Sequence, residues 1–235
     1  MAKDYIEAFS IYNKTNILFA SKALMTGAVA KVLASLGLGF DVVSKGEMFV
    51  LLNAGVGLEK SSFNGNNKSQ EEIEFAIDNR IDHFSVDNFF ELKELNSIAN
   101  KKNKVQKIHL RITPNIECHT HDYIKTGQID SKFGFPLDKI DKAVSLVLNE
   151  YKNLKLTGLH AHIGSQIFET QPYYDLVSVL LNEIKKIKDK YSYELTEINI
   201  GGGLGITYTK ADNPPSVFDI AKIVVKPNSE EDVLT

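Results

Sequence analysis

Short apolar runs alternate with segments of helical periodicity along most of this chain. The apolar runs predict strands at residues 17–20, 40–43, 61–63, 83–86, 108–112, 156–163 and 197–200. Segments with apolar residues at helical spacing follow them at 28–36, 47–52, 70–78, 89–99, 138–148, 173–188 and 217–225. Strands that are apolar on both faces and separated by helices are typical of a parallel sheet. We therefore predict an α/β fold built from repeated strand–helix units.

Seven such units favour a (β/α)8 barrel of the TIM type that lacks its last unit. A doubly wound open sheet is the alternative. We treat residues 1–235 as a single barrel domain, incomplete at its C-terminal end, although the length would also allow two smaller domains. In either architecture, side chains with a chemical function are expected at the carboxyl ends of the strands.

The overall composition narrows the class of protein. Hydrophobic residues make up 43% and charged residues 24%, as in ordinary globular proteins. The net charge of -3 argues against a nucleic-acid partner, and no apolar run is long enough to span a membrane. The first residues lack the apolar core of a signal peptide. Cys118 is the single cysteine, which rules out an internal disulfide. We expect a cytoplasmic protein.

A run of three glycines follows the last predicted strand. Gly201, Gly202 and Gly203 come directly after Ile198-Asn199-Ile200, and Leu204-Gly205 follow. Consecutive glycines let another group approach the backbone closely. That group is often a phosphate bound by peptide N–H groups. The alternative is a tight turn between a strand and a helix.

A lysine follows the first predicted strand. Lys22 comes directly after Ile17-Leu18-Phe19-Ala20-Ser21, so we expect it at the mouth of the barrel and partly buried. Burial lowers the pKa of an amine and favours the neutral nucleophile that forms a Schiff base. The alternative is an ordinary surface lysine on a loop.

Two histidines lie at alternate positions near the sixth predicted strand, within Gly158-Leu159-His160-Ala161-His162-Ile163-Gly164-Ser165-Gln166. Side chains alternate along a strand, so both imidazoles are expected on one face. His162 could stack on a planar ring beside a phosphate bound by Ser165, or it could bind zinc. His119 and His121 form a second pair, but no adjacent acid or cysteine completes a metal set. For His160, a hydrogen-bonded interior histidine is the preferred interpretation.

Several short motifs lie in a characteristic order from about residue 5 to residue 208. They are Ala20-Ser21-Lys22-Ala23, Gly39-Phe40-Asp41-Val42-Val43-Ser44-Lys45-Gly46-Glu47, Asn64-Gly65-Asn66-Asn67-Lys68-Ser69, Val86-Asp87-Asn88, Arg111-Ile112-Thr113-Pro114, His121-Asp122-Tyr123-Ile124-Lys125-Thr126-Gly127 and Ser131-Lys132-Phe133-Gly134, followed by the histidine and glycine segments above. This combination resembles the fold-type III pyridoxal-phosphate decarboxylases, which have an alanine racemase-type barrel. Within them it looks like the branch that acts on diaminopimelate, more than the ornithine or arginine branches.

The resemblance implies a role for each of four side chains. Lys22 would form the Schiff base with pyridoxal 5'-phosphate, and Asp41 would lie near that lysine and help set its charge. His162 would stack on the pyridine ring. Arg111 would sit deep in the site near the phenolic oxygen of the cofactor. No metal is implied.

The resemblance also implies the phosphate site and the reaction. Ser165 would bind the phosphate together with Gly201, Gly202 and Gly203. The cofactor would delocalise the carbanion left when an amino acid loses CO2. The substrate would be meso-diaminopimelate and the product L-lysine, in lysine biosynthesis, and the full-length family would form homodimers.

The chain departs from the family pattern in several places. Leu24-Met25-Thr26 stands where the family usually has an asparagine. The Glu-Pro-Gly-Arg segment expected after the eighth strand, the C-terminal β-domain and the strand before Tyr5 are not found, so the chain looks like a decarboxylase cut at both ends. We therefore expect poor decarboxylation by this chain alone. A non-catalytic or truncated homologue is one alternative, and a metal-dependent barrel hydrolase using the His-x-His pairs is another.

Overall fold

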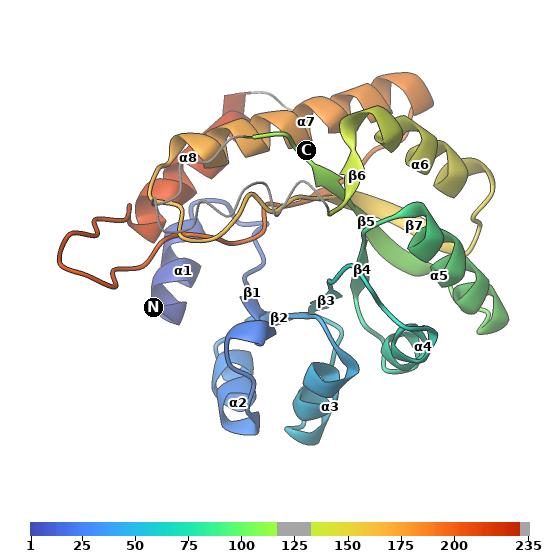
Figure 1. The fold of residues 1–235 in the computed structure, drawn as a ribbon, viewed down its shortest axis with the longest axis horizontal. Helices are drawn as coiled ribbons and strands as arrows, with labels where there is room; N and C mark the ends of the chain where they lie inside the picture. Colours follow the sequence, from blue (N-terminus) through green and yellow to red (C-terminus); the bar gives the residue numbers. More distant parts are fainter. Residues whose placement is uncertain (117–132, 231–235) are drawn as a thin grey trace.

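The computed structural model describes residues 1–116 and 133–230. Within them, parallel strands form one curled sheet in the order β1-β2-β3-β4-β5-β7-β8, with β6 paired to β5 (Figure 1). The strands are β1 (Leu18–Ala20), β2 (Gly39–Val42), β3 (Ser61–Phe63), β4 (His83–Val86), β5 (Gln106–Thr113), β6 (Phe135–Pro136), β7 (Leu154–His160) and β8 (Glu197–Asn199). Sequential neighbours joined by crossovers are the topology of a (β/α)8 barrel, so the predicted fold class is confirmed and the doubly wound alternative is wrong.

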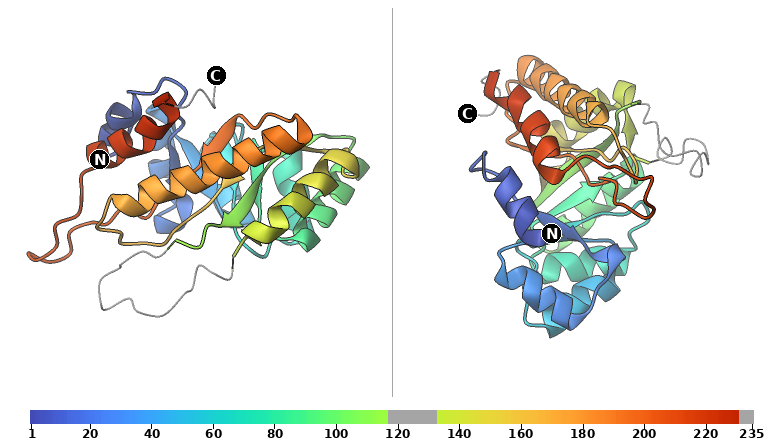
Figure 2. Two further views of the ribbon diagram at one scale, coloured as in Figure 1. Left: turned by 90° about the horizontal axis from the view of Figure 1, so that it is seen from above. Right: turned by 90° about the vertical axis from the view of Figure 1, so that its left-hand side faces the viewer.

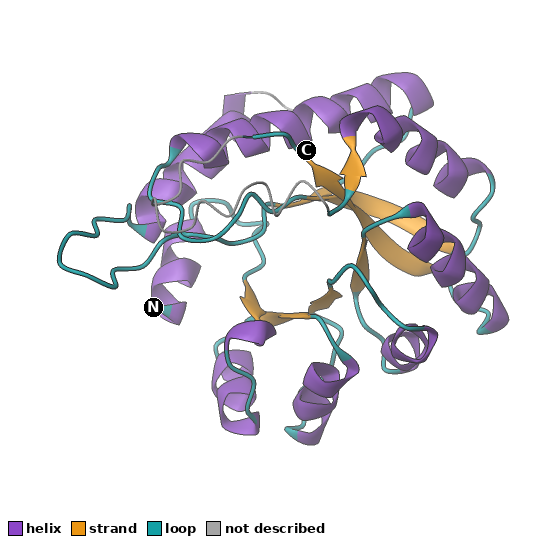
Figure 3. Ribbon diagram, in the orientation of Figure 1, coloured by secondary structure: helices purple, strands orange, loops and turns teal. Residues whose placement is uncertain are grey.

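Helices surround the outer face of this sheet (Figure 3). They are α1 (Ala2–Phe9), α2 (Gly27–Ser35), α3 (Lys45–Asn53), α4 (Gln70–Asp78), α5 (Phe89–Lys101), α6 (Leu137–Asn149), α7 (Gln171–Tyr191) and α8 (Val217–Glu230), with a short 3₁₀ turn at Ser21–Ala23. Among the described helices, none combines the length and the apolar character needed to cross a membrane.

Side-chain caps fix where the early helices begin. The capping residues of α2, α3, α4 and α5 are Thr26, Ser44, Ser69 and Asn88, and each side chain accepts a hydrogen bond from a backbone N–H in the first turn. Such caps satisfy N–H groups that have no partner within the helix. Because each cap lies shortly after a strand, it also fixes the loop at that strand's carboxyl end.

The two faces of the sheet differ in polarity, which corrects the expectation of strands that are apolar on both faces. Phe40, Phe63 and Phe84 point outward and are buried in the core between sheet and helices. The alternate positions point into the barrel, and there Asp41 and Arg111 line a cavity. The interior of this barrel is therefore a polar chamber instead of a second hydrophobic core.

The curled sheet is open on one side. Within the described residues, no ladder of hydrogen bonds joins β1 to β8. Helices α1 and α8 pack against each other (Figure 2). This opening agrees with the prediction of a barrel that lacks a strand between its ends.

The elements differ from the predicted ones in three places. Helix α1 and strand β6 were not predicted, and β7 ends at His160. His162 therefore lies on the loop after β7 and not within the strand. The other predicted strands and helices are present with their ends shifted by a few residues.

Candidate active site

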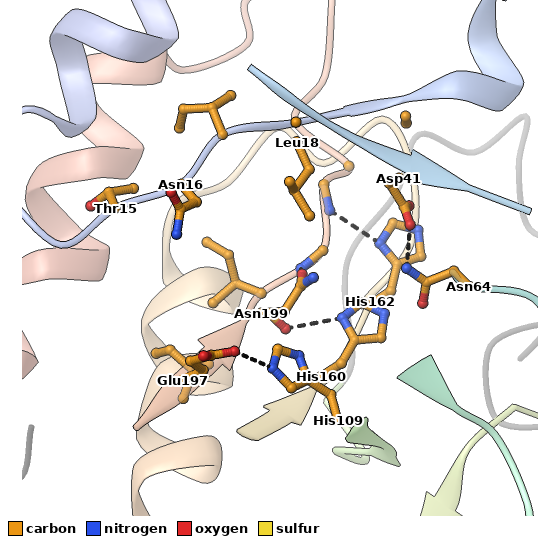
Figure 4. A pocket seen from close by; sticks show the side chains of 18 of the residues that line it. Thr15, Asn16, Leu18, Asp41, Asn64, His109, His160, His162, Glu197 and Asn199 are labelled. Atoms are coloured by element: carbon orange, nitrogen blue, oxygen red, sulfur yellow. Dashed lines mark hydrogen bonds and ion pairs between the residues drawn. The ribbon is translucent and has the colours of Figure 1, made fainter. Parts of the chain in front are cut away.

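One cavity of about 2030 Å³ runs through the barrel, and all the predicted site residues line it. They are Lys22, Asp41, Arg111, His162, Ser165, Gly201, Gly202 and Gly203. The sheet register explains why they meet: Ala20 pairs with Asp41 and Arg111 pairs with His160, which in turn pairs with Asn199. These positions are at or near the carboxyl ends of the strands, as predicted; Asp41, His160 and Asn199 are labelled in Figure 4.

The glycine turn is packed too closely for side chains at two of its three positions. A Cβ atom on Gly203 would lie 2.1 Å from the carbonyl oxygen of Gly164, and one on Gly201 would lie 2.8 Å from Nδ1 of His162. Both glycines also have positive φ, 68° at Gly201 and 102° at Gly203. A Cβ on Gly202 would meet nothing within 4 Å. The turn therefore holds its backbone against the loop after β7 and leaves open space at its centre, as a cradle for an anion requires.

The side chains around this turn are arranged by hydrogen bonds. Asn199 accepts a hydrogen bond from the N–H of Gly201 at 2.9 Å, and Nδ1 of His162 accepts one from the N–H of Gly202 at 3.4 Å. The hydroxyl of Tyr173 donates to the carbonyl of Gly202 at 3.4 Å. His162 is half-buried, so part of its ring faces the cavity.

His160 has the structural role that the sequence favoured. It is buried, and its Nδ1 donates to the carbonyl of Asn199 at 3.1 Å (Figure 4). Burial, together with the charge of Arg111, holds the pKa of His160 well below its ordinary value. A neutral interior imidazole that bridges β7 and β8 needs no ligand to explain it.

Asp41 is held by an asparagine that sequence reasoning did not single out. The amide of Asn64, directly after β3, donates a hydrogen bond to Oδ1 of Asp41. Burial raises the pKa of Asp41 to about 6, although the bond from Asn64 and the charge of Lys22 act in the opposite direction. Asp41 can therefore gain or lose a proton near neutral pH. The position of Asn64 at a strand's carboxyl end was the signal that could have identified it.

Lys22 lines the cavity, but its side chain is exposed, so the expectation of partial burial is wrong. It lies on the 3₁₀ turn after β1, at the rim of the barrel, and the adjacent Leu24 is 57% exposed. Lys22 nevertheless lies close enough to Asp41 and Glu47 to lower the pKa of both carboxyl groups, against the larger effect of burial.

Arg111 is supported from behind by a buried ionic network. Its guanidinium lies 3.6 Å from Oδ1 of Asp87 and over the ring of Phe133, 5.0 Å from the centroid. The N–H of Asp87 donates to Glu91, whose carboxylate pairs with the fully buried amine of Lys68 at 2.7 Å. Lys68 and Asp87 lie within motifs noted in the sequence, but no role was predicted for either. Lys68 pairs with Glu91 and Asp87 with Arg111, and both contacts join elements that are separated in the sequence.

The described residues do not support a metal site at the His-x-His pair. His119 and His121, the second pair of that hypothesis, lie outside the described residues. Where the structure does describe the chain, the side chains that could close around a cation are His83, His109 and Glu197. That group includes neither His160 nor His162.

The site's donors fit pyridoxal phosphate. The open glycine turn and the exposed hydroxyl of Ser165 suit a phosphate, and Lys22 offers an amine to an aldehyde. His162 presents a ring face and Arg111 a cation to the same cavity. The tight approach at Gly203, where a Cβ would collide with backbone, explains why glycine is required in this cradle.

The sequence also resembles proteins of known family. The pyridoxal binding domain of the pyridoxal-dependent decarboxylases matches residues 2–230. The chain is 45% identical over 232 residues to a diaminopimelate decarboxylase of Synechocystis sp., covering 94% of this chain and 49% of the relative. It is 39% identical over 228 residues to that of Bacillus subtilis, covering 96% and 52%. The chain thus spans about half the length of the curated relatives it matches.

Solved structures agree with the sequence comparison. The diaminopimelate decarboxylase of M. jannaschii in complex with L-lysine superimposes with a TM-score of 0.88 at 32% identity, covering 99% of this chain and 55% of that one. The Helicobacter pylori enzyme complexed with L-lysine gives 0.85 at 30% identity, with 99% and 60% covered. With a family match over almost the whole sequence, this chain belongs to the pyridoxal-dependent decarboxylases and corresponds to their pyridoxal-binding domain.

Proposed function

We propose that this chain is the cofactor-binding part of a diaminopimelate decarboxylase, which converts meso-diaminopimelate to L-lysine and CO2. The observation that carries the proposal is the convergence of Lys22, Arg111, His162 and the glycine turn on one cavity. The names of the relatives support the substrate, since both curated relatives described above are diaminopimelate decarboxylases. As the family resemblance implies, the complete protein would be a cytoplasmic homodimer.

Four side chains would hold the reactive end and the ring of pyridoxal phosphate. Lys22 would hold the aldehyde carbon through its amine, and His162 would cover one face of the ring. Arg111, fixed by Asp87, would bind the phenolic oxygen. The buried network behind Arg111 would keep its guanidinium oriented without the loss of side-chain entropy on binding.

The phosphate would be bound by neutral donors. The N–H groups of the turn at Gly201–Gly203 and the hydroxyl of Ser165 would hold it. The N–H groups of Gly201 and Gly202, which donate to Asn199 and His162 in this structure, would exchange those partners for the phosphate. The glycine turn would therefore set the depth at which the cofactor sits in the cavity.

When bound, pyridoxal phosphate supplies the electron sink that stabilises the carbanion left by loss of CO2. The residues of this chain would position the cofactor and place charged groups beside it. Asp41 lies near Lys22, and because its pKa is raised to about 6 it can hold a proton at its carboxyl group or release it. Asn64 fixes the direction of that carboxyl group through its hydrogen bond to Oδ1.

The cofactor assignment is tested by titrating the purified chain with pyridoxal phosphate, following visible absorption, and then reducing with borohydride and mapping peptides. We expect the label on Lys22 and its loss in Lys22→Ala. Lys45→Ala is the matched control, because Lys45 also follows a strand's carboxyl end but pairs with Glu71 and does not line the cavity. Labelling of another lysine in the unaltered chain contradicts the assignment.

The substrate is tested on the complete protein that contains this chain, by measuring amino-acid product and CO2 from meso-diaminopimelate, ornithine and arginine in parallel. We expect preference for meso-diaminopimelate. Equal or greater release from ornithine or arginine contradicts the substrate, while leaving the cofactor assignment to the labelling experiment.

A further inference from the structure

A second polar cluster lines the same cavity, deeper in the barrel than the candidate active site. His83 and Glu197 are the first residues of β4 and β8, and His109 lies on β5 two residues before Arg111. His83 and His109 are 6% and 3% exposed. Because all strands run in parallel, these side chains lie toward the amino ends of the strands, away from the glycine turn. Nothing in the proposed decarboxylation uses them.

Carboxylates fix the orientation of both imidazoles. Nδ1 of His83 donates to Asp82 at 2.9 Å, and Nε2 of His109 donates to Glu197 at 2.7 Å (the second bond is drawn in Figure 4). Each hydrogen bond places the lone pair of the ring on the opposite nitrogen. A histidine whose ring N–H is bound by a carboxylate is the arrangement that commonly supports metal-ligating histidines.

The two remaining nitrogens are buried and have no hydrogen-bond partner among the residues that the structure describes. They are Nε2 of His83 and Nδ1 of His109. A buried acceptor without a donor destabilises a fold, so such atoms usually indicate a missing partner.

The backbone is shaped to bring His109 and Glu197 together. Strand β7 lies between β5 and β8, and at the level of these side chains it carries Gly158, which pairs with both. A Cβ atom there would lie 2.2 Å from the carbonyl oxygen of Glu197 and 2.9 Å from its Cβ. The register of β5 and β7 also shifts between Ile108 and His109, and such irregularities redirect a side chain.

We propose that His83, His109 and Glu197 form a binding site for a divalent cation of the zinc class. One ligand atom from each residue lies within 4.8 Å of the other two. The ion would be bound by Nε2 of His83 and Nδ1 of His109, at about 2.0–2.1 Å, with water completing the tetrahedral set. Glu197 would support the site from behind by keeping its hydrogen bond to Nε2 of His109. The imidazole rings of His83 and His109 are stacked, with centroids 4.1 Å apart and planes tilted by 32°. For both rings to bind one ion, one of them would turn about its χ2 bond.

The ion would be structural, because it would join strands that are distant in the sheet. It would tie β4 and β5 to β8, the strand at the open edge that carries the glycine turn at its other end. The cavity that contains the cluster also provides an entry path. The site is independent of pyridoxal phosphate and of the proposed reaction.

The test is a titration of the chelator-treated chain with Zn²⁺ by calorimetry and with Co²⁺ by visible absorption, which reports tetrahedral coordination. We expect one bound ion per chain at this site, lost in His83→Gln and in His109→Gln. Glu197→Gln keeps the size of the side chain but removes its charge, and should weaken binding at least tenfold. His162→Gln, from the other end of the cavity, is the matched control and should retain the ion.

Folding is checked separately by circular dichroism. If either histidine variant fails to fold, Glu197→Gln decides the question: at a fixed Zn²⁺ concentration the thermal midpoint of the parent chain should rise by more than that of Glu197→Gln. Identical titrations of the parent and His109→Gln would overturn the proposal. So would the absence of binding by the parent at millimolar Zn²⁺, which would assign the two nitrogens to buried water.

Discussion

The two ends of the barrel interior hold similar side chains in different surroundings. At the carboxyl ends, Asp41, Arg111 and His162 are partly accessible and face an open turn. Two residues before Arg111 on β5, His109 is buried and bonded to a carboxylate. Polar groups near the rim can hydrogen-bond to water or to a ligand, so they need no fixed partner within the protein and remain available for binding. Those in the interior need fixed partners, because an unpaired buried polar group is destabilising.

Removing the buried cation behind Arg111 should have the largest effect. Lys68→Met leaves the carboxylate of Glu91 buried without its partner, and such a loss costs about 3–5 kcal/mol. Lys102→Met breaks the exposed pair with Asp78 and should cost less than about 1 kcal/mol. Urea unfolding of both variants measures the difference. Equal losses would mean that burial does not distinguish these ion pairs.

The glycine turn offers a comparison between adjacent positions. Gly203→Ala should destabilise the chain by roughly 2–4 kcal/mol, because the added Cβ collides with the carbonyl of Gly164 and φ is 102°. Gly202→Ala meets open space and should change stability by less than about 0.5 kcal/mol. Unfolding curves and pyridoxal-phosphate affinity are measured together. A well-folded Gly203→Ala with unchanged affinity would contradict the packing described for the turn.

The carboxyl groups of Asp41 and Glu72 should make the free energy of unfolding depend on pH in opposite directions. Burial raises the pKa of Asp41 from 3.8 to about 6, so the folded chain binds more protons than the unfolded chain in that range. Stability from this group is therefore lost as pH rises from about 4 to 6, by on the order of 3 kcal/mol. Asp41→Asn should remove this decline in unfolding experiments between pH 4 and pH 7.

Glu72 provides the control with the opposite sign. Burial would raise its pKa, but hydrogen bonds from Ser69 and Lys45 outweigh that effect and lower it. Its contribution is present above its ordinary pKa and is lost as pH falls through the lowered value. Glu72→Gln should therefore reduce the loss of stability in acid. If the two variants change the pH profile in the same direction, the environment inferred for Asp41 is wrong.

The smallest effect is expected at the rim. Ser165→Ala removes one hydroxyl donor to the phosphate while the backbone donors remain, so pyridoxal-phosphate affinity should fall about five- to tenfold, or roughly 1 kcal/mol. Ser178→Ala, on the outer helix α7, is the control and should bind normally. Absorbance titrations give both affinities, and an unchanged affinity of Ser165→Ala would remove that residue from the phosphate site.

The sequence predicted the repeated strand–helix units and the residues at the carboxyl ends of the strands because both follow from local patterns. Lys22 follows a strand, and the glycine turn follows another, so a parallel sheet brings them together. Local patterns could not predict the pairing of Lys68 with Glu91 or of His109 with Glu197. Each of these pairs depends on which strands and helices become neighbours.

The polar inner face was also missed, for a related reason. Each short strand has an outer face buried under helices and an inner face enclosed by the barrel. When only the large residues are counted, such a strand looks apolar on both faces. The requirement for glycine at position 158 was missed for the same reason. A side chain there would collide with the backbone of Glu197 on β8, which is distant in the sequence. Helix α1 was missed as well, since its N-cap, Met1, makes no side-chain hydrogen bond that a sequence pattern would reveal.

The packing of α1 against α8 has a consequence for the order of events during synthesis. Helix α1 is synthesised before the other helices that the structure describes, and its partner is the last of them. Closing a loop that contains all the elements between them is entropically unfavourable, so this contact should form late. Until α8 emerges, the apolar side of α1 near Ala8 remains uncovered and available to chaperones. Among the described helices, an early one to be synthesised is thus among the last to reach its final environment.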